Sequence, residues 1–245
     1  MGRIIAVTSG KGGVGKTTLA CFISEGLSRL GRRVAAVDGD MGLRNLDIMF
    51  GVQNSIVYDA GDVIERRCKL EEALVQTPAG PQYLAAANQV LGQSGLEMFR
   101  RVILALKPYF DYVIVDCAAG IGQLTLASAL CADEVIVVTT PEETAIRDAE
   151  RMSVALHRGG MKNQRLIVNR INPKFIRWGK APDIDSIIDS VAVRLLGIVP
   201  VEPMLPVLQN RGESIFDSDY KNAARQLADI CLRLDGTYMP LRKIR

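Results

Sequence analysis

Short apolar runs rich in β-branched residues alternate with longer segments of helical periodicity along most of the chain. The runs cover residues 3–8, 33–38, 112–116, 134–139, 165–169 and 196–199. A short run that is apolar throughout is typical of a strand buried on both faces, as in a parallel sheet. The pattern therefore predicts six buried parallel strands.

Helix-length segments lie between and after these runs, at residues 16–30, 95–106, 122–131, 141–157 and 219–234. Several end near Gly31, Pro108 or Gly159, which are ordinary helix stop signals. Such alternation predicts an α/β fold, with a mostly parallel sheet flanked by helices on both faces. We expect one domain over residues 1–235, a short tail over 236–245, and a long surface loop over 172–185 that exposes Trp178.

The last helical segment carries an apolar stripe of Ala223, Leu227, Ile230 and Leu234. A stripe at this spacing predicts that the helix packs against the core.

Composition narrows the classes of protein that the chain can belong to. With 245 residues and 48% apolar content it can bury a large core. A net charge of +3 is too small for the whole surface to bind a polyanion. Five scattered cysteines without a C-x-x-C pair predict neither disulfides nor a zinc site, and a reducing cytoplasm is the expected setting. No signal peptide or apolar run of membrane-spanning length is present, so we expect neither export nor a membrane span.

The stretch VTSGKGGVGKTTLA, residues 7–20, joins the first predicted strand to the first helix and contains the phosphate-binding pattern G-x-x-x-x-G-K-T. Its glycines allow successive backbone N–H groups to surround phosphate oxygens at the positive end of a helix. Lys16 is expected to reach the β- and γ-phosphates. Thr17 is expected to hold Mg²⁺ through its hydroxyl, and Thr18 to contact the α-phosphate.

Carboxylates follow two of the predicted strands. Asp116 ends the run YVIVD, and Asp38 and Asp40 follow another run in the stretch VDGD. A bound metal needs anionic support of this kind, so Asp116 is predicted to support Mg²⁺ and one of the other two to orient the attacking water. The guanine-reading pattern N-K-x-D is absent, which favours ATP over GTP.

A second lysine in the loop, Lys11, is not required by the phosphate-binding pattern. The stretch KGGVGKTT resembles the deviant Walker A motif of the MinD/ParA superfamily of ATPases. The stretches DGDMGLRNLDIMFG, DCAAGIG, ADEVIVVTTPEETAIRDAER, NRINP and GIVPVE resemble the MinD family within it, and the resemblance covers roughly residues 2–235. One departure is the segment Cys117–Ala119, which replaces the family's usual D-x-P.

The resemblance implies an ATPase that dimerises on ATP, places the division septum, and recruits MinC- or MinE-like regulators. Lys11 would then contact the nucleotide of the partner subunit, and Glu142 would approach it across the dimer. Asp40 would orient the attacking water, Asp38 would belong to the metal shell, and Asp116 with Gly120 would begin the second switch segment. Asn169 would read the adenine edge.

The residues expected at each site follow from the motif and the resemblance together. The nucleotide-binding set is Gly10, Lys11, Gly12, Gly13, Val14, Gly15, Lys16, Thr17, Thr18, Glu142, Asn169, Arg170, Pro200 and Val201. The catalytic residues are Lys11, Lys16 and Asp40, and the metal residues are Thr17, Asp38 and Asp116. Asp148 and Glu150 would bind regulators, although a solvated helix face explains these two residues equally well.

The tail carries a further expectation, reversible attachment to the inner face of the cell membrane. Its composition suits an anionic lipid surface, although Pro240 leaves too few residues for a free helix. One tail would bind weakly, while two tails on a dimer would bind better. A frayed, solvated end is the alternative. The membrane residues would be Tyr238, Met239, Leu241, Arg242, Lys243, Ile244 and Arg245.

Two other functions remain open at this point. A ParA- or FlhG-like ATPase would position DNA or a flagellum, and a metabolic P-loop enzyme would carry a substrate pocket. Apart from the tail, the chain shows only scattered arginine pairs near residues 32, 66 and 100, so we do not expect nucleic-acid binding. Lys11 argues against a metabolic enzyme.

Overall fold

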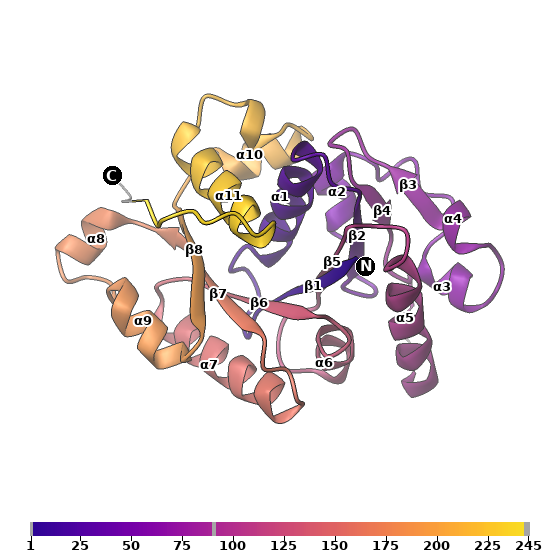
Figure 1. Cartoon of the computed structure of the whole chain (residues 1–245), viewed down its shortest axis with the longest axis horizontal. Coiled ribbons are helices and arrows are strands. Elements are labelled where there is room, and N and C mark those ends of the chain that lie inside the picture. The colour runs from indigo at the N-terminus through magenta and orange to yellow at the C-terminus, as the bar shows by residue number, and fades with distance from the viewer. Residues whose placement is uncertain (1, 90–91, 243–245) are drawn as a thin grey trace.

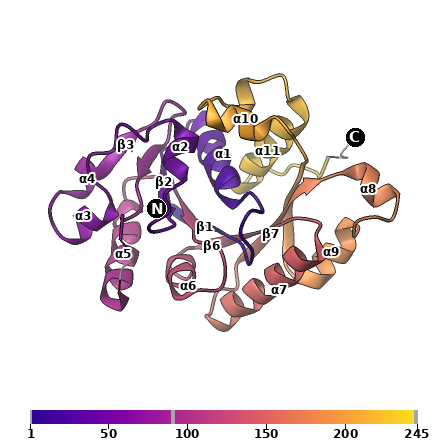
Figure 2. The same cartoon turned by 180° about the vertical axis from the view of Figure 1, so that it is seen from behind.

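A computed structural model describes residues 2–89 and 92–242, and shows one eight-stranded sheet with helices on both faces (Figures 1 and 2). The strand order is β3-β4-β2-β5-β1-β6-β7-β8. All six predicted strands are present. They are β1 (Arg3–Thr8), β2 (Val34–Gly39), β5 (Tyr112–Cys117), β6 (Glu134–Thr139), β7 (Gln164–Ile171) and β8 (Arg194–Pro200).

Two short strands were missed by the sequence analysis, namely β3 (Leu74–Gln76) and β4 (Gln82–Leu84). Each has only three residues, too few for a periodic pattern to stand out. They pair antiparallel with each other, whereas all the other strand pairs among the described residues are parallel.

The register aligns the carboxyl ends of the central strands. Val7 of β1 lies opposite Asp116 of β5 and Ile136 of β6, and Asp38 of β2 lies opposite Asp116 from the other side. Because the phosphate-binding loop follows β1 directly, this register brings the loop and the two carboxylate-bearing strand ends to one edge of the sheet.

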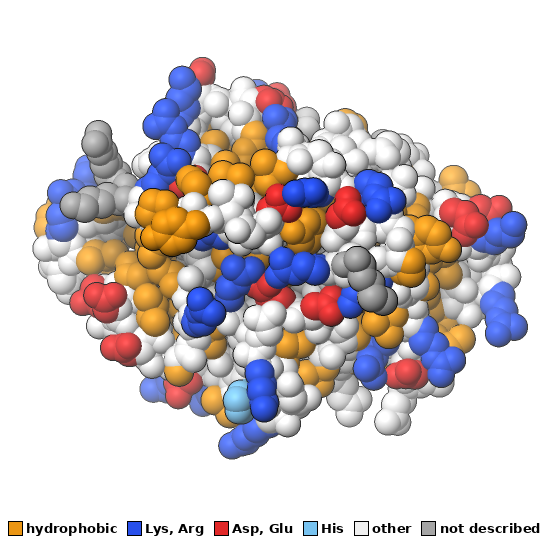
Figure 3. Space-filling view, in the orientation of Figure 1, with side chains coloured by type: hydrophobic (Ala, Val, Ile, Leu, Met, Phe, Trp, Pro, Cys, Tyr) orange, Lys and Arg blue, Asp and Glu red, His pale blue; other side chains and the backbone are white. Residues whose placement is uncertain are grey.

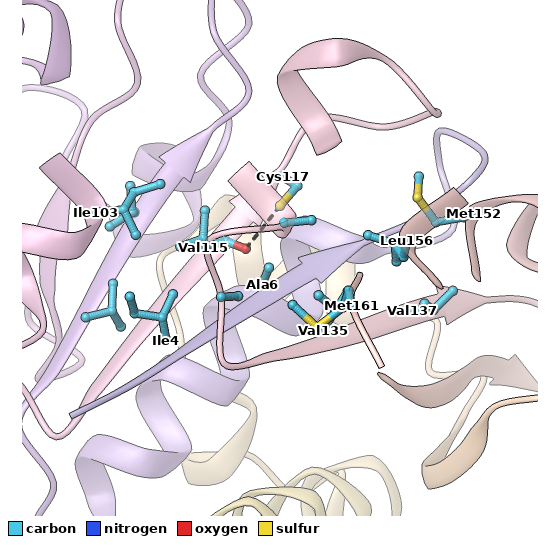
Figure 4. Packing of buried hydrophobic residues seen from close by; sticks show 14 of the residues in the cluster. Ile4, Ala6, Ile103, Val115, Cys117, Val135, Val137, Met152, Leu156 and Met161 are labelled. Carbon is cyan, nitrogen blue, oxygen red and sulfur yellow. Dashed lines mark hydrogen bonds between the residues drawn. The ribbon is translucent and has the colours of Figure 1, made fainter. Parts of the chain in front are cut away.

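Hydrophobic clusters of described residues cover both faces of the sheet. On one face lie α1 (Lys16–Arg29) and α11 (Lys221–Leu234). On the other lie α5 (Gln93–Leu106), α6 (Gln123–Ala129), α7 (Glu143–Arg158) and α9 (Ile184–Val191). Figure 4 shows this second cluster, where Met152 and Leu156 of α7 and Ile103 of α5 meet the side chains of the central strands.

The apolar stripe of α11 packs against the sheet as predicted, since all four of its side chains are fully buried. Contact is close at Gly197 of β8, where a Cβ atom would lie 2.4 Å from Cγ1 of Ile230. Only glycine allows the helix to approach the strand at this position. The five cysteines are free, which agrees with their scattered spacing.

The prediction of a long loop over residues 172–185 is partly wrong. This segment contains a short helix, α8 (Pro173–Arg177), and α9 begins at Ile184, before the predicted loop ends. Asn172 caps α8 by accepting a hydrogen bond from the backbone N–H of Lys174, and Pro173 occupies the first turn. Trp178, which follows α8, is exposed as expected.

The remaining short helices lie in the connections between these elements. They are α2 (Leu46–Phe50), α3 (Ala60–Ile64), α4 (Leu70–Ala73), α10 (Leu205–Asn210) and a 3-10 turn at Ile215–Asp217. Within the described residues, no helix is long and apolar enough to cross a membrane.

Candidate nucleotide-binding site

The loop between β1 and α1 forms a nest of backbone groups. Gly13 and Gly15 adopt left-handed conformations with φ of 79° and 90°. Gly15 is the N-cap of α1 and supplies no side-chain cap, so the start of the helix faces the cleft. Such a helix start, preceded by glycines, is suited to a phosphate group.

Two adjoining hollows lie at this loop. The larger, of about 530 Å³, includes Gly12, Gly13, Lys16, Thr17 and Asp40 in its lining. The smaller, of about 220 Å³, is lined in part by Asn169, Arg170, Pro200 and Val201. Gly15, Thr18 and Arg170 border both. Together they offer a polar end for phosphates and a separate end that contains all four residues expected around the base.

Lys16 and Asp116 form a buried ion pair at this site. The lysine Nζ lies 2.6 Å from Oδ1 of Asp116, and the side chains are 7% and 1% exposed. Lys16 also donates to the hydroxyl of Thr17 at 3.3 Å. Burial raises the pKa of the Asp116 carboxyl, although Lys16 opposes this effect. The predicted phosphate ligand and the predicted metal support are thus in direct contact.

Asp38 is completely buried and holds the loop that carries Asp40. Its Oδ1 accepts from the backbone N–H of Asp40 at 2.9 Å, and its Oδ2 accepts from the N–H groups of Asn45 and Leu46 and from the hydroxyl of Tyr83. Burial, followed by the charge of Asp116, raises the pKa of Asp38 to about 6. Its contacts position the loop, and its role beside a metal stays a prediction.

Among the described residues, no group of three acidic, histidine or cysteine side chains could hold a metal ion by itself. Thr17 and Asp40 line the larger hollow, whereas Asp116 and Asp38 are buried and do not line it. This arrangement suits Mg²⁺, which usually keeps several waters and takes its other ligands from substrate phosphates and one or two protein groups.

Lys11 does not line either hollow, although it belongs to the same loop. Its Nζ lies 3.1 Å from Oε2 of Glu142 and donates to the hydroxyl of Thr144 at 3.0 Å. Lys11 and Glu142 are the two residues expected to reach across a dimer. In the single chain they neutralise each other at the surface.

Asn169 lies against the loop rather than free in the smaller hollow. Its Nδ2 donates to the carbonyl of Val14, and its Oδ1 accepts from the backbone N–H of Arg170. Gly10 also serves packing, because a Cβ there would lie 2.0 Å from the backbone carbonyl oxygen of Asp148 in α7.

The outer face of α7 is mixed in charge rather than acidic. Oδ1 of Asp148 lies 3.6 Å from Nη1 of Arg151. Glu150 lines a shallow hollow together with Arg147, Arg151 and Arg158. The regulator-binding role of Asp148 and Glu150 stays a prediction.

The described part of the tail, residues 236–242, lies along α11. Arg233 donates to the carbonyls of Met239 and Pro240 at 2.8 Å, and Arg242 pairs with Asp229. Tyr238 is 88% exposed and Leu241 is also exposed. Lys243, Ile244 and Arg245 lie outside the described residues, and membrane binding by the tail stays a prediction.

Two contributors to the site were missed by the sequence analysis. Tyr83 lies on the unrecognised strand β4 and reaches Asp38 across the sheet. Thr144 accepts a hydrogen bond from the Nζ of Lys11, which also donates to Glu142. The two contacts join residues that are 45 and 133 positions apart in the sequence, so neither leaves a local signal.

Comparison with known proteins identifies the family. A family model described as an AAA domain matches residues 2–166. The septum site-determining protein MinD of Bacillus subtilis is 41% identical to this chain, over 99% of the chain and 92% of the relative. The chain belongs to the MinD family.

Solved MinD structures share the fold of this MinD-family ATPase. MinD in the MinC:MinD cell division complex of Aquifex aeolicus superposes with a TM-score of 0.91 at 37% identity, covering 98% of this chain and 99% of that one. MinD of Pyrococcus horikoshii, complexed with Mg-ADP, gives a TM-score of 0.83 at 28% identity, with 96% of each chain covered. The eight-stranded P-loop fold is therefore that of MinD.

Proposed function

We propose that this chain is an ATP-dependent dimerising switch that takes part in placing the division septum. The observation that carries the proposal is the position of Lys11. It is a second cation in the phosphate-binding loop, it lies outside the chain's own cleft, and it is held at the surface by Glu142. A cation in this place is available to the phosphates of a second subunit, whose charge depends on whether ATP has been cleaved.

The bound group is proposed to be Mg-ATP. The uncapped start of α1 and the left-handed Gly13 and Gly15 suit phosphates, and the smaller hollow beside Asn169 suits a base. The Pyrococcus relative is complexed with Mg-ADP. When bound, the metal would stabilise the charge that develops on the transferred phosphoryl group. Thr17 would hold it, and Asp40, in the lining of the same hollow, would orient the attacking water.

Partners and location complete the proposal. The Aquifex relative is part of a MinC:MinD complex, and a regulator of this kind on α7 is proposed here. The exposed Tyr238 and Leu241 of the tail support reversible binding to the inner face of the cell membrane from the cytoplasm. Two tails on one dimer would strengthen that binding through effective concentration.

The decisive experiment measures mass in solution with and without Mg-ATP by size-exclusion chromatography with light scattering. The Asp40→Ala protein is expected to accumulate as a dimer with ATP and to be a monomer without it. Adding Lys11→Ala should return it to a monomer while binding of a fluorescent ATP analogue persists. Adding Lys162→Ala, which removes an exposed lysine outside the cleft, should leave the dimer intact. A monomer throughout would refute the switch.

A further inference from the structure

A compact aromatic and basic cluster projects from the sheet edge at α8. We call it the α8 knob and define it by Lys174, Phe175, Arg177, Trp178 and Lys180. The side chains of Phe175 and Trp178 are 47% and 61% exposed, and their ring centroids are 6.1 Å apart. The Nζ of Lys180 lies 5.7 Å from the centre of the Trp178 ring. None of these residues lines the nucleotide hollows.

Core packing does not account for the exposed rings. No residue of α8 is fully buried, so the helix contributes little to the core. Of the α8 residues, only Ile176 packs against the hydrophobic cluster to which α7 contributes. The Asn172 cap and Pro173 order the first turn. The rings are therefore presented to solvent on an ordered support, which marks an interaction site.

The charge of the knob selects its partner. From Pro173 to Pro182 the sequence holds three basic residues and no acidic one. Lys174, Arg177 and Lys180 have no ion-pair partner within the described part of the chain. Exposed tryptophan and phenylalanine beside unpaired cations are complementary to the headgroup region of an anionic bilayer.

The knob and the tail lie at the same end of the molecule. Strand β8 forms the edge of the sheet, β7 beside it leads into α8, and Arg233 beneath the tail donates to the carbonyl of Leu196 in β8. Figures 1 and 2 show α8 and the end of the described tail at one side of the fold. On that side the space-filling view shows hydrophobic side chains beside basic ones, with acidic side chains further along the same side (Figure 3).

We propose that the α8 knob is a second lipid-contacting element, in which Phe175 and Trp178 enter the interface of an anionic membrane while Lys174, Arg177 and Lys180 meet its headgroups. The inference rests on the membrane association in the proposed function and adds a contact outside the tail. Two weak elements on one rigid body bind cooperatively, because attachment of one raises the effective concentration of the other.

Tryptophan fluorescence tests this directly, because Trp178 is the single tryptophan in the chain. The full chain with Asp40→Ala and Mg-ATP is mixed with vesicles of equimolar phosphatidylglycerol and phosphatidylcholine. The emission should shift to shorter wavelength, and lipids brominated near the headgroup end of the acyl chain should quench it. Pure phosphatidylcholine vesicles should produce neither change.

Co-sedimentation separates the knob from the rest of the proposal. Replacing both rings, Phe175→Ser with Trp178→Ser, should weaken vesicle binding by about tenfold. Tyr109→Ser, which removes an equally exposed ring after α5, should leave binding unchanged. ATP-dependent dimerisation should persist in both variants, because none of these side chains is buried or lies in the cleft.

The outcomes are distinguishable. Sedimentation of the parent protein with anionic vesicles but without a tryptophan shift would overturn the knob and keep the membrane proposal. A shift caused by ATP alone, without lipid, would show that the knob meets a second copy of the chain, and would also overturn it. Neither sedimentation nor a shift would overturn both the knob and the membrane part of the proposed function.

Discussion

Replacing Lys16 by alanine should destabilise the nucleotide-free protein as well as its ATP complex. The lysine Nζ and the Asp116 carboxylate are 2.6 Å apart and almost fully buried. At an effective dielectric constant of about 20, unit charges at this distance attract by about 6 kcal/mol, from which the cost of burying the lysine must be deducted. Removing one partner of a buried pair costs about 3–5 kcal/mol, because the other charge stays behind. We expect a loss in this range at about pH 8.

The free energy of unfolding that is lost in Lys16→Ala should depend on pH, and the protonation of Asp116 decides whether the loss is larger at high or at low pH. Burial already raises the pKa of this carboxyl with the lysine present, and removing the lysine raises it further. A carboxyl whose pKa is raised by folding adds stability below its unfolded pKa, and this contribution is lost as the pH rises through the folded value. The cost of Lys16→Ala should therefore be smaller in acidic solution than at about pH 8, because protonation of Asp116 removes the charge that the mutation leaves without a partner.

Urea unfolding followed by circular dichroism, without nucleotide and at both pH values, measures these differences. The matched background is Asp116→Asn, which removes the carboxylate. There Lys16 is a buried cation without its partner, so Lys16→Ala should cost little or even stabilise the protein. The reasoning is refuted if Lys16→Ala costs less than about 1 kcal/mol at the higher pH, or if its cost is the same at both pH values or in both backgrounds.

Three further predictions concern stability without nucleotide. Burial and the charge of Asp116 raise the pKa of Asp38 from 3.8 to about 6, so the free energy of unfolding should fall as the pH rises across that window. Asp38→Asn should flatten the fall in a urea series, and an unchanged slope would contradict the assignment. Gly15→Ala places a Cβ 2.4 Å from Nδ2 of Asn169 at a φ of 90° and should cost roughly 1–3 kcal/mol in thermal unfolding. Gly12→Ala, where a Cβ meets nothing within 4 Å, is its control, and equal losses would argue against the clash. Ile230→Ala should cost about 2–5 kcal/mol by chemical denaturation, because the side chain is fully buried, and a cost near zero would show that the core collapses around the gap.

Much of the fold could be predicted because its signals are local. A buried strand such as β1 is apolar from Ile4 to Val7, and α11 repeats an apolar residue about once each turn, so neighbouring residues alone reveal them. The two three-residue strands at the sheet edge and the short helix α8 escaped because they are too brief for a period to form. The two strands are held by pairing with each other and with β2, which does not appear in a window of sequence, whereas α8 is ordered by the local cap of Asn172 and by Pro173.

The candidate site divides in the same way. The glycines of the phosphate-binding pattern, Lys16 and Thr17 lie together in one short stretch of the chain. The sequence by itself therefore determined a phosphate-binding loop at the start of a helix. The order of parallel strands decided that Asp116 would meet Lys16, a contact over 100 residues of sequence. Likewise, only the folded chain pairs Lys11 with Glu142.

The tertiary structure also decided which roles the remaining side chains take. The place of Asp38 in the metal shell stays a prediction, and only the fold shows that its two oxygens also hold the loop of Asp40. The tail was a string of apolar and basic residues, and in the fold its described part lies along α11 at the same end as the α8 knob. The physical reason is that residue type sets what a side chain can bind, whereas burial and the approach of distant strands and helices decide which partner it meets.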